Sequence, residues 1–274
     1  KNAMADLPLG GGKAVILGPV MPENRTAVLE AFGRAVESLN GAYITAEDVG
    51  VNVADMQTVA RTTRFVSGLE GAEGRSGGDP SPYTARGVRV GIEAAVRAQL
   101  GRPEVAGLAV AVQGLGHVGM YLCQELHELG ANLVVADINA ARVEEAVARF
   151  GARAVGVDEV LTQDVDVVAP CALGGAISEY VARYVKAKIV AGAANNQLAT
   201  PEAGRILAER GILYAPDYVI NAGGIIMVSG EISGDNDTAL TLQRVDAIGA
   251  RLDAIFATAK AENVITNEVA DRMA

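Results

Sequence analysis

A glycine-rich turn at residues 114–119, with the sequence GLGHVG, follows an apolar run and precedes a stretch with helical periodicity. In a strand–turn–helix unit of this kind, the helix N-terminus and the amides of the turn hold a pyrophosphate. Gly114 permits the tight turn, Gly116 lets the backbone approach the pyrophosphate, and Gly119 allows close packing of helix on strand. Asp137 ends the next apolar run, where an acid can bind the ribose hydroxyls. The pattern predicts a dinucleotide site.

The residues around this turn favour NAD over NADP as the cofactor. The carboxylate of Asp137 would repel the 2′-phosphate of NADP, although Arg142, one helical turn further on, weakens the preference slightly. His117 and Val118 occupy variable positions of the turn and are expected beside the cofactor, with His117 a surface residue rather than a catalyst. The alternative interpretation is an ordinary glycine-rich turn followed by a helix-capping aspartate.

A second glycine-rich segment places Lys13 directly after LGGG at residues 9–12. It is not a phosphate-binding P-loop, because Leu7 replaces the first glycine of that motif and Ala14 replaces its Ser or Thr. Glycines beside a lysine let the backbone pack around the ammonium and desolvate it, which favours the neutral amine of a catalytic base. A flexible hairpin with a solvated lysine explains the same residues equally well.

Three polar residues follow segments that read as strands. Asp48 lies near the end of the strand-like run 43–49, and Asn195 follows an apolar strand. Asn221 follows residues 217–220, which we also interpret as a strand end. Ligands bind at the C-terminal ends of strands in open α/β sheets, so these side chains are candidate site residues. Turn and capping chemistry is the alternative for each of them.

Short apolar runs alternate with amphipathic segments along most of the chain. Strands are expected at 14–18, 43–49, 108–113, 132–137, 165–170, 189–193 and 212–215. Helices are expected at 23–39, 53–63, 83–100, from the glycine-rich turn to 129, at 140–150, 177–186, 201–210 and through 245–259. Apolar strands alternating with helices predict an α/β fold with a doubly wound, Rossmann-type parallel sheet covered on both faces.

Glycines and prolines between residues 71 and 82 mark the best domain boundary. We expect an α/β substrate domain at residues 1–78 and an NAD-binding domain at 79–226. Residues 227–274 would form C-terminal helices that pack back toward the substrate domain. The active site would then lie in the cleft between the two domains.

Composition excludes several classes of protein. The net charge of −10 lacks the electrostatic footprint of a nucleic-acid binder, and no apolar run approaches the length of about 20 residues that spans a bilayer. Two cysteines are too few for a disulfide framework, so a reducing, cytoplasmic setting is expected. With two histidines, no metal site is expected. The chain starts on Lys1 without an initiator Met and stops inside a predicted helix, as a fragment would.

Several further motifs carry a family resemblance. In chain order they are LGGGK at 9–13, ITAEDVG at 44–50, VADM at 53–56, APCALGG at 169–175, GAANNQL at 192–198 and YAPDYVINAGG at 214–224, with the fingerprint between them. Together with KNA at 1–3, they resemble the Glu/Leu/Phe/Val amino acid dehydrogenase family, and most of all its leucine and valine branch. The resemblance implies an NAD-dependent enzyme that reversibly deaminates an L-amino acid to a 2-oxo acid and ammonia, and that is a homo-oligomer.

The resemblance also assigns roles to individual residues. Lys13 falls on the catalytic lysine of the family, Asp48 on its proton-transferring aspartate, and Lys1 on the lysine that grips the substrate carboxylate. Asn195 and Asn221 fall on amides that line the substrate and nicotinamide site. Thr84 falls on a threonine that contacts the nicotinamide carboxamide.

One departure concerns the beginning of the chain. Family members carry several dozen residues before the position of Lys1, as part of the substrate domain. Without that segment, we expect the substrate pocket to lack one wall.

The predicted helix after Asn221 bears on the substrate side chain. Ile225 and Val228 are three residues apart and share one face of it, without a charged residue to meet a side-chain carboxylate. Leucine, valine or isoleucine is therefore expected in preference to glutamate or phenylalanine, unless these two residues simply pack against the core. Phenylalanine or glutamate dehydrogenase is the alternative within the family, and a non-catalytic NAD-binding or oligomerisation module is the alternative outside it.

Overall fold

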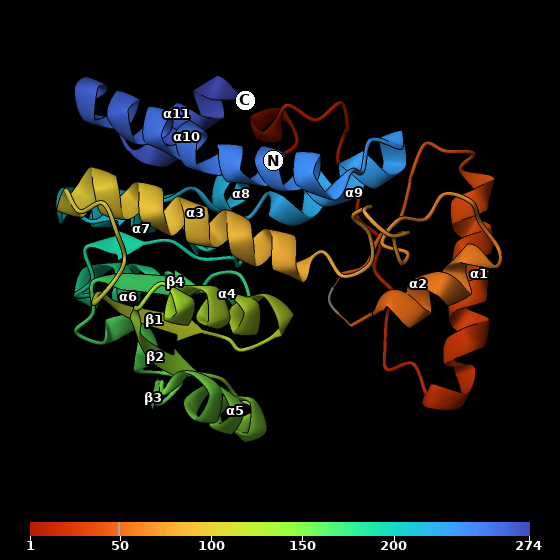
Figure 1. The fold of residues 1–274 in the computed structure, drawn as a ribbon, viewed down its shortest axis with the longest axis horizontal. Helices are drawn as coiled ribbons and strands as arrows, with labels where there is room; N and C mark the ends of the chain where they lie inside the picture. The colour runs from red at the N-terminus through yellow and green to blue at the C-terminus, as the bar shows by residue number, and fades with distance from the viewer. Residues whose placement is uncertain (49) are drawn as a thin grey trace.

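The computed structural model describes residues 1–48 and 50–274, and a six-stranded parallel sheet forms the centre of its larger part (Figure 1). The strands are β1 (Ala109–Gln113), β2 (Asn132–Ala136), β3 (Arg153–Ala154), β4 (Val167–Pro170), β5 (Ile189–Val190) and β6 (Leu213–Tyr214). Their order, β3-β2-β1-β4-β5-β6, makes the chain wind outward in both directions from the point between β1 and β4. This order confirms the predicted doubly wound sheet, whose ligands bind beside that point.

Helices cover both faces of the sheet. They are α3 (Ser81–Leu100), α4 (His117–Glu128), α5 (Ala140–Phe150), α6 (Glu179–Tyr184), α7 (Pro201–Glu209), α8 (Asp217–Ile220), α9 (Gly223–Ser233), α10 (Thr238–Glu262) and α11 (Thr266–Met273), with a 3₁₀ turn, η3, at Val160–Thr162. Alternate residues of β1 belong to different apolar clusters: Val110 and Val112 lie in the cluster with α3, α4 and α10, and Ala111 in the cluster with α6 and α7. The sheet is therefore buried on both sides, as its unbroken apolar strands predict.

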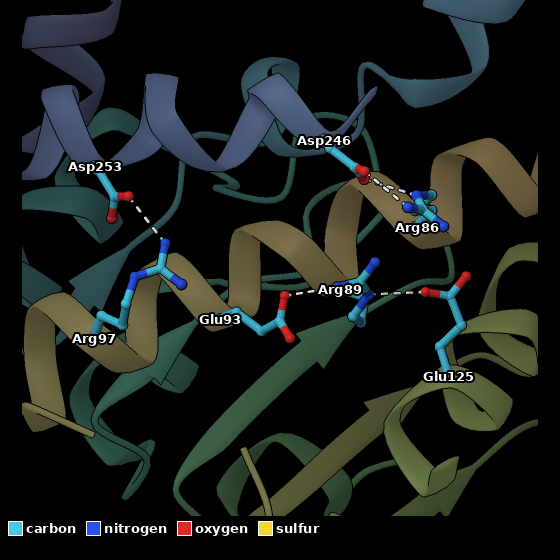
Figure 2. A network of polar contacts seen from close by, with 7 residues as sticks. All are labelled: Arg86, Arg89, Glu93, Arg97, Glu125, Asp246 and Asp253. Atoms are coloured by element: carbon cyan, nitrogen blue, oxygen red, sulfur yellow. Dashed lines mark hydrogen bonds and ion pairs between the residues drawn. The ribbon is translucent and has the colours of Figure 1, made fainter. Parts of the chain in front are cut away.

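Helix α3 lies between α10 and α4 and packs against both of them. Figure 2 shows the ion pairs that accompany this packing. Arg86 and Arg97 of α3 reach Asp246 and Asp253 of α10, at 2.7 and 2.9 Å. A third set joins α3 to α4, with the Arg89 guanidinium 3.0 Å from the carboxylate of Glu125 and 2.7 Å from that of Glu93 on its own helix.

Two helices, α1 (Arg25–Ser38) and α2 (Val53–Ala60), form a separate and smaller part at one end of the molecule (Figure 1). A 3₁₀ turn, η2 (Pro22–Asn24), leads into α1. Leu29, Met56 and Val59 form its buried apolar cluster, and Val36 of α1 is also buried. We call residues 22–78 the small unit and residues 79–274 the large unit.

Residues 1–8 pack against the large unit. Their 3₁₀ turn, η1 (Ala3–Ala5), buries Met4, which is 3% exposed, in the same apolar cluster as the sheet. Asp6 pairs with Arg251 of α10. Lys1 is thereby held close to Asn195, which follows β5, although the two residues are far apart in sequence.

Four segments differ from the sequence-based expectation. Residues 14–18 form no strand among the described residues; Val15 and Leu17 are 76% and 89% exposed, and an extended segment needs a pairing partner to become a strand. The run 43–49 makes only a bridge, Thr45 to Val66, and Val49 lies outside the described residues. Residues 217–220 are the helix α8 rather than a strand. The short edge strand β3 was not predicted.

Both cysteines are free. Among the described residues, no helix is long and apolar enough to cross a membrane.

Candidate functional site

The turn between β1 and α4 has the backbone geometry of a pyrophosphate cradle. Gly114 has a φ of 93°, and a Cβ there would lie 2.8 Å from the backbone nitrogen of Ala172. A Cβ on Gly119 would lie 2.0 Å from the carbonyl oxygen of Gly114. Only glycine fits at these two positions, and Gly116 is the N-cap of α4 with open space at its Cβ position. The N-terminus of α4 therefore lies accessible beside the turn, where a helix binds phosphate.

Asp137 is oriented by this turn. The amide of Leu115 donates a hydrogen bond to its Oδ2 at 2.6 Å, and the amide of Asn139 donates to its Oδ1 at 2.7 Å. Arg142 also approaches the turn, with a guanidinium nitrogen 3.9 Å from the Cβ position of Gly116. His117 is exposed and Val118 half-buried at the start of α4. The structure thus brings the predicted cofactor residues of the turn and the next strand together.

A second group joins three candidate residues from distant parts of the chain. The Nζ of Lys1 donates a hydrogen bond to Oδ1 of Asn195 at 2.8 Å. The Nδ2 of Asn221 donates to the same oxygen at 3.0 Å and to the carbonyl of Ala193 at 2.9 Å. Asn221 is buried, and its Oδ1 has no hydrogen-bond partner among the described residues. A buried amide oxygen in that state is available to a ligand N–H.

Asn221 reaches this place in a way that the sequence did not predict. It follows the helix α8 as its C-cap, and not a strand. A short apolar run such as 217–220 fits a strand or a helix equally well by its periodicity. Asp217, the first residue of α8, accepts a hydrogen bond from the amide of Gln197 at 2.7 Å, which ties α8 to the segment that carries Asn195.

The ammonium of Lys1 lies in an unusual electrostatic environment. Although the residue as a whole is exposed, desolvation lowers the pKa of its ammonium from 10.5 to about 8. The negative charge of Asp217 opposes this shift, and the positive charge of Lys13 adds to it. Lys13 and Lys1 are therefore near enough to influence each other, and together they make the site attractive to an anion such as a carboxylate.

Lys13 and Asp48 form an ion pair in the structure. Their side chains are 68% and 48% exposed, so the close backbone packing around Lys13 expected from its glycines does not occur among the described residues. Gly10 and Gly11 have no atom within 4 Å of their Cβ positions, whereas Gly12 packs on the ring of Tyr43. The family resemblance implied a catalytic role for each residue, and their pairing is a finding of the structure.

The segment that carries Asp48 also lies near the nucleotide turn. Side-chain atoms of Glu47, Asp79 and His117 lie within 4.8 Å of one another. Burial is the main cause that raises the pKa of Glu47, the charge of Asp79 adds to it, and His117 opposes it. The sequence analysis did not predict that Glu47 and Asp79 lie beside the glycine-rich turn. The three residues belong to segments far apart in sequence, and no spacing pattern relates them.

Thr84 and the first turn of α9 meet beside Asn221. A Cβ on Gly223 would lie 1.9 Å from the carbonyl oxygen of Tyr83, and one on Gly224 would lie 2.7 Å from Oγ1 of Thr84. This close approach places the N-terminus of α9 against that of α3. Within α9, Ile225 is half-buried and packs on the main cluster, and Val228 is buried.

The arrangement offers three kinds of chemistry within one region. The large unit supplies a turn suited to a dinucleotide, and Lys1 with Asn195 and Asn221 supplies an ammonium–amide group suited to a carboxylate. Lys13 and Asp48 supply an amine and a carboxylate suited to proton transfer. A small substrate with a carboxylate and an exchangeable proton fits this combination.

Comparison with protein families gives two matches that together span most of the chain. The family model described as Glutamate/Leucine/Phenylalanine/Valine dehydrogenase matches residues 77–146 and 136–270. The model described as Glu/Leu/Phe/Val dehydrogenase, dimerisation domain, matches residues 1–65.

Individual relatives are similar over the whole chain. The leucine dehydrogenase of Geobacillus stearothermophilus is 47% identical over 100% of this chain and 74% of its own length. The valine dehydrogenase of Streptomyces virginiae is 44% identical over 100% of this chain and 77% of its own. The crystal structure of L-tryptophan dehydrogenase from Nostoc punctiforme superposes with a TM-score of 0.80 and 43% identity, covering 99% of this chain and 77% of that one.

Proposed function

The chain belongs to the Glutamate/Leucine/Phenylalanine/Valine dehydrogenase family of NAD(P)-dependent amino acid dehydrogenases, and we propose that it deaminates a branched-chain aliphatic L-amino acid with NAD. The products are the 2-oxo acid and ammonia, and the reaction is reversible. One observation carries the proposal: Lys1, Asn195 and Asn221, from distant parts of the chain, join in one hydrogen-bonded group, while Lys13 forms an ion pair with Asp48.

In the proposed mechanism, the ammonium of Lys1 pairs with the substrate carboxylate while Asn195 orients it. Asp48 accepts a proton from the substrate ammonium, because nitrogen needs a lone pair before an iminium can form at Cα. NAD, held by the nucleotide turn, would supply the hydride acceptor for Cα. Lys13 then acts as the base on the water that attacks the iminium. Asp48 returns its proton to the amino group of the resulting carbinolamine, the C–N bond breaks, and ammonia leaves with the hydroxyl proton as the carbonyl of the 2-oxo acid forms.

The cofactor proposal rests on the turn and on Asp137. The glycines at 114 and 119 allow the tight turn and its close packing, because a Cβ at either position would clash with neighbouring backbone. Asp137 is held at the end of β2, where its carboxylate disfavours a 2′-phosphate. Thr84 and Asn221 are proposed to hold the nicotinamide end, since both lie where α3 and α9 meet.

The substrate proposal rests on the first turns of α9. Ile225 and Val228 share one face of this helix and are both apolar and branched, so a side-chain carboxylate there would be buried without a partner. The relatives do not decide among amino acids, because a leucine, a valine and a tryptophan dehydrogenase are similar to this chain to nearly the same degree. The competing activities are therefore a phenylalanine or glutamate dehydrogenase, as the sequence suggested, and also a tryptophan dehydrogenase.

We also propose that residues 1–78, 79–226 and 227–274 act as substrate domain, nucleotide-binding domain and C-terminal helices. The protein would work as a homo-oligomer in the cytoplasm. The match of residues 1–65 to a dimerisation domain supports the homo-oligomer. The two free cysteines support the cytoplasmic location.

The test is a panel of L-amino acids with NAD and with NADP, followed by reduction of the nicotinamide. We expect the highest kcat/KM with leucine, valine or isoleucine. A preference for tryptophan, phenylalanine or glutamate would contradict the assignment of Ile225 and Val228. A protein that binds NAD but oxidises none of the panel would instead support the non-catalytic module.

A further inference from the structure

Glu231, near the C-terminal end of α9, holds the backbone of the small unit. Its Oε2 accepts hydrogen bonds from Oγ of Ser67 at 2.7 Å and from the amide of Gly68 at 2.8 Å. Its Oε1 accepts a longer one from the amide of Leu69 at 3.3 Å. Ser67 and Gly68 are buried, so these donors have no access to bulk water. One carboxylate of the large unit thus satisfies three donors of the small unit.

The segment held in this way supports the residues just before Asp48. The amide of Thr45 donates to the carbonyl of Phe65 at 3.0 Å, and the amide of Ser67 donates to the carbonyl of Thr45 at 2.8 Å. Gly68 has a φ of 82°, and its Cβ position lies 3.6 Å from the Cβ of Glu47. The backbone of residues 45–47 therefore rests directly on residues 65–68.

The other end of α9 belongs to the proposed ligand site. The helix begins two residues after Asn221, and its first residues, Gly223 and Gly224, press against α3. Both sets of contacts belong to one continuous helix of 11 residues, and Glu231 lies about two turns after Gly224. An α-helix of this length is stiff, so its two ends keep a constant separation.

We propose that Glu231 is a positioning residue that sets Asp48 at the correct place relative to the nicotinamide end of the site. It acts through the backbone of residues 65–69 and does not touch the substrate. A carboxylate suits the task because both of its oxygens accept, whereas an amide would turn an N–H toward one of the three donors. The role in proton transfer rests on the proposed function of Asp48.

The chain contains a matched control. Glu37 of α1 accepts hydrogen bonds from Oγ1 of Thr63 at 2.8 Å and from the amide of Arg64 at 3.1 Å. It holds the same loop by the same pattern of one hydroxyl and one amide. Glu37 belongs to the small unit, however, so its contacts do not connect the two units.

The experiment compares Glu231→Ala, Glu231→Gln and Glu37→Gln with the unchanged protein. It measures kcat and KM with L-leucine and NAD, the Kd of NAD, and hydrogen exchange of the backbone amides. For Glu231→Ala we expect kcat to fall about 100-fold, as for a small misplacement of a catalytic group, with the Kd of NAD nearly unchanged. Glu231→Gln should lie between this variant and the unchanged protein. Exchange should become faster at residues 45–47 and 66–69 in both Glu231 variants.

Glu37→Gln should leave kcat and the exchange of residues 45–47 nearly unchanged. An unaltered kcat in Glu231→Ala would overturn the proposal, and so would an equal loss in the Glu231 and Glu37 variants, since that indicates general loosening of the small unit. If the unchanged protein oxidises no amino acid, the proposed function fails. The exchange of residues 45–47 then decides whether Glu231 positions this segment: unaltered exchange in Glu231→Ala overturns it.

Discussion

The large and the small unit hold their parts of the site by different means. In the large unit, the turn at 114–119 and the side chains of Asn195 and Asn221 follow elements of a sheet that is buried on both faces. In the small unit, Asp48 lies on a segment with one bridge to its neighbour, and its partner Lys13 lies in the exposed segment that precedes this unit. The apolar cluster described in the small unit is small: its buried side chains are Leu29, Met56 and Val59, and Val36 of α1 is buried outside that cluster.

The proposed binding residues and the proposed proton-transferring residues are therefore held in place by different kinds of contact. The residues proposed to hold the cofactor follow strands that are packed on both faces. The proposed proton-transferring pair is exposed, and the segment before Asp48 rests on residues that are held by Glu231 of the other unit. Changes in the small unit, and at Glu231, which holds it, should therefore alter rates more than cofactor affinity, and changes at the nucleotide turn should do the reverse.

The largest effect should come from the proton-transferring pair. Lys13→Ala and Asp48→Asn should each lower kcat about 10²- to 10⁴-fold, the usual contribution of a general acid or base, while the Kd of NAD stays nearly unchanged. Steady-state kinetics and a fluorescence titration of NAD measure the two quantities. Lys260→Ala, which removes an exposed lysine of α10, is the control. If either site variant keeps most of its activity, the roles assigned to the pair are wrong.

The next effect concerns cofactor choice in the large unit. Like charges at close range cost several kcal/mol, so NAD should exceed NADP in kcat/KM by about 10²-fold or more. Asp137→Asn keeps an oxygen acceptor for the amide of Leu115 but removes the charge, and it should reduce this ratio. Glu144→Gln removes an exposed charge from α5 and should not. Equal kcat/KM values with the two cofactors in the unchanged protein would contradict this reading of Asp137.

A packing change tests whether the small unit can loosen by itself. A Cβ on Gly33 would lie 2.1 Å from Oγ1 of Thr62 and 2.8 Å from the carbonyl oxygen of Val59. Gly33→Ala should destabilise the packing of α1 on α2 by about 1–3 kcal/mol, the usual cost of overpacking. Gly10→Ala, whose Cβ meets open space, should cost nothing measurable.

Hydrogen exchange of α1 and α2 measures this loosening, and thermal unfolding reports on the whole chain. We expect faster exchange in the small unit of Gly33→Ala with little change in the exchange of β1 and β4. Equal acceleration in both units would show that they unfold together, and the comparison between them would not hold.

The smallest effect should be the pH dependence of carboxylate binding. The pKa of Lys1 is lowered to about 8, so the ammonium loses its charge as pH rises through that value. The dissociation constant of the 2-oxo acid should therefore increase above pH 8, by up to about tenfold per pH unit, and be constant below it. The carboxylate of the ligand stays ionised over this whole range. Lys1→Arg keeps its charge and should bind with a constant affinity across pH 8.

The nucleotide half of the site could be predicted well from the sequence. The spacing of glycines at 114–119, their place between an apolar strand and a helix, and Asp137 at the next strand end depend only on local chain geometry. The resemblance to a family then identified Lys13 and Asp48, whose physical environment in the sequence was ambiguous. The structure pairs them, but in an exposed loop rather than in a desolvated one.

The remaining contacts join segments that are far apart in sequence, so no local pattern signals them. Asn221 was expected at a strand end and lies at the end of a short helix, because a four-residue apolar run does not distinguish the two. Residues 14–18 have the composition of a strand, yet no described segment pairs with them. Glu231 and Ser67 are separated by 164 positions, and neither belongs to a motif.

The sequence by itself therefore determined the doubly wound sheet, the glycine-rich turn after β1 and the acidic residue, Asp137, at the end of the next strand. These features follow from backbone sterics and from the periodic burial of neighbouring residues. Only the tertiary structure decided which groups from distant segments meet: Lys1 with Asn195, Glu47 with His117, and Glu231 with the backbone that supports Asp48. Such contacts depend on how distant segments are placed relative to one another, and that placement is set by packing over the whole chain.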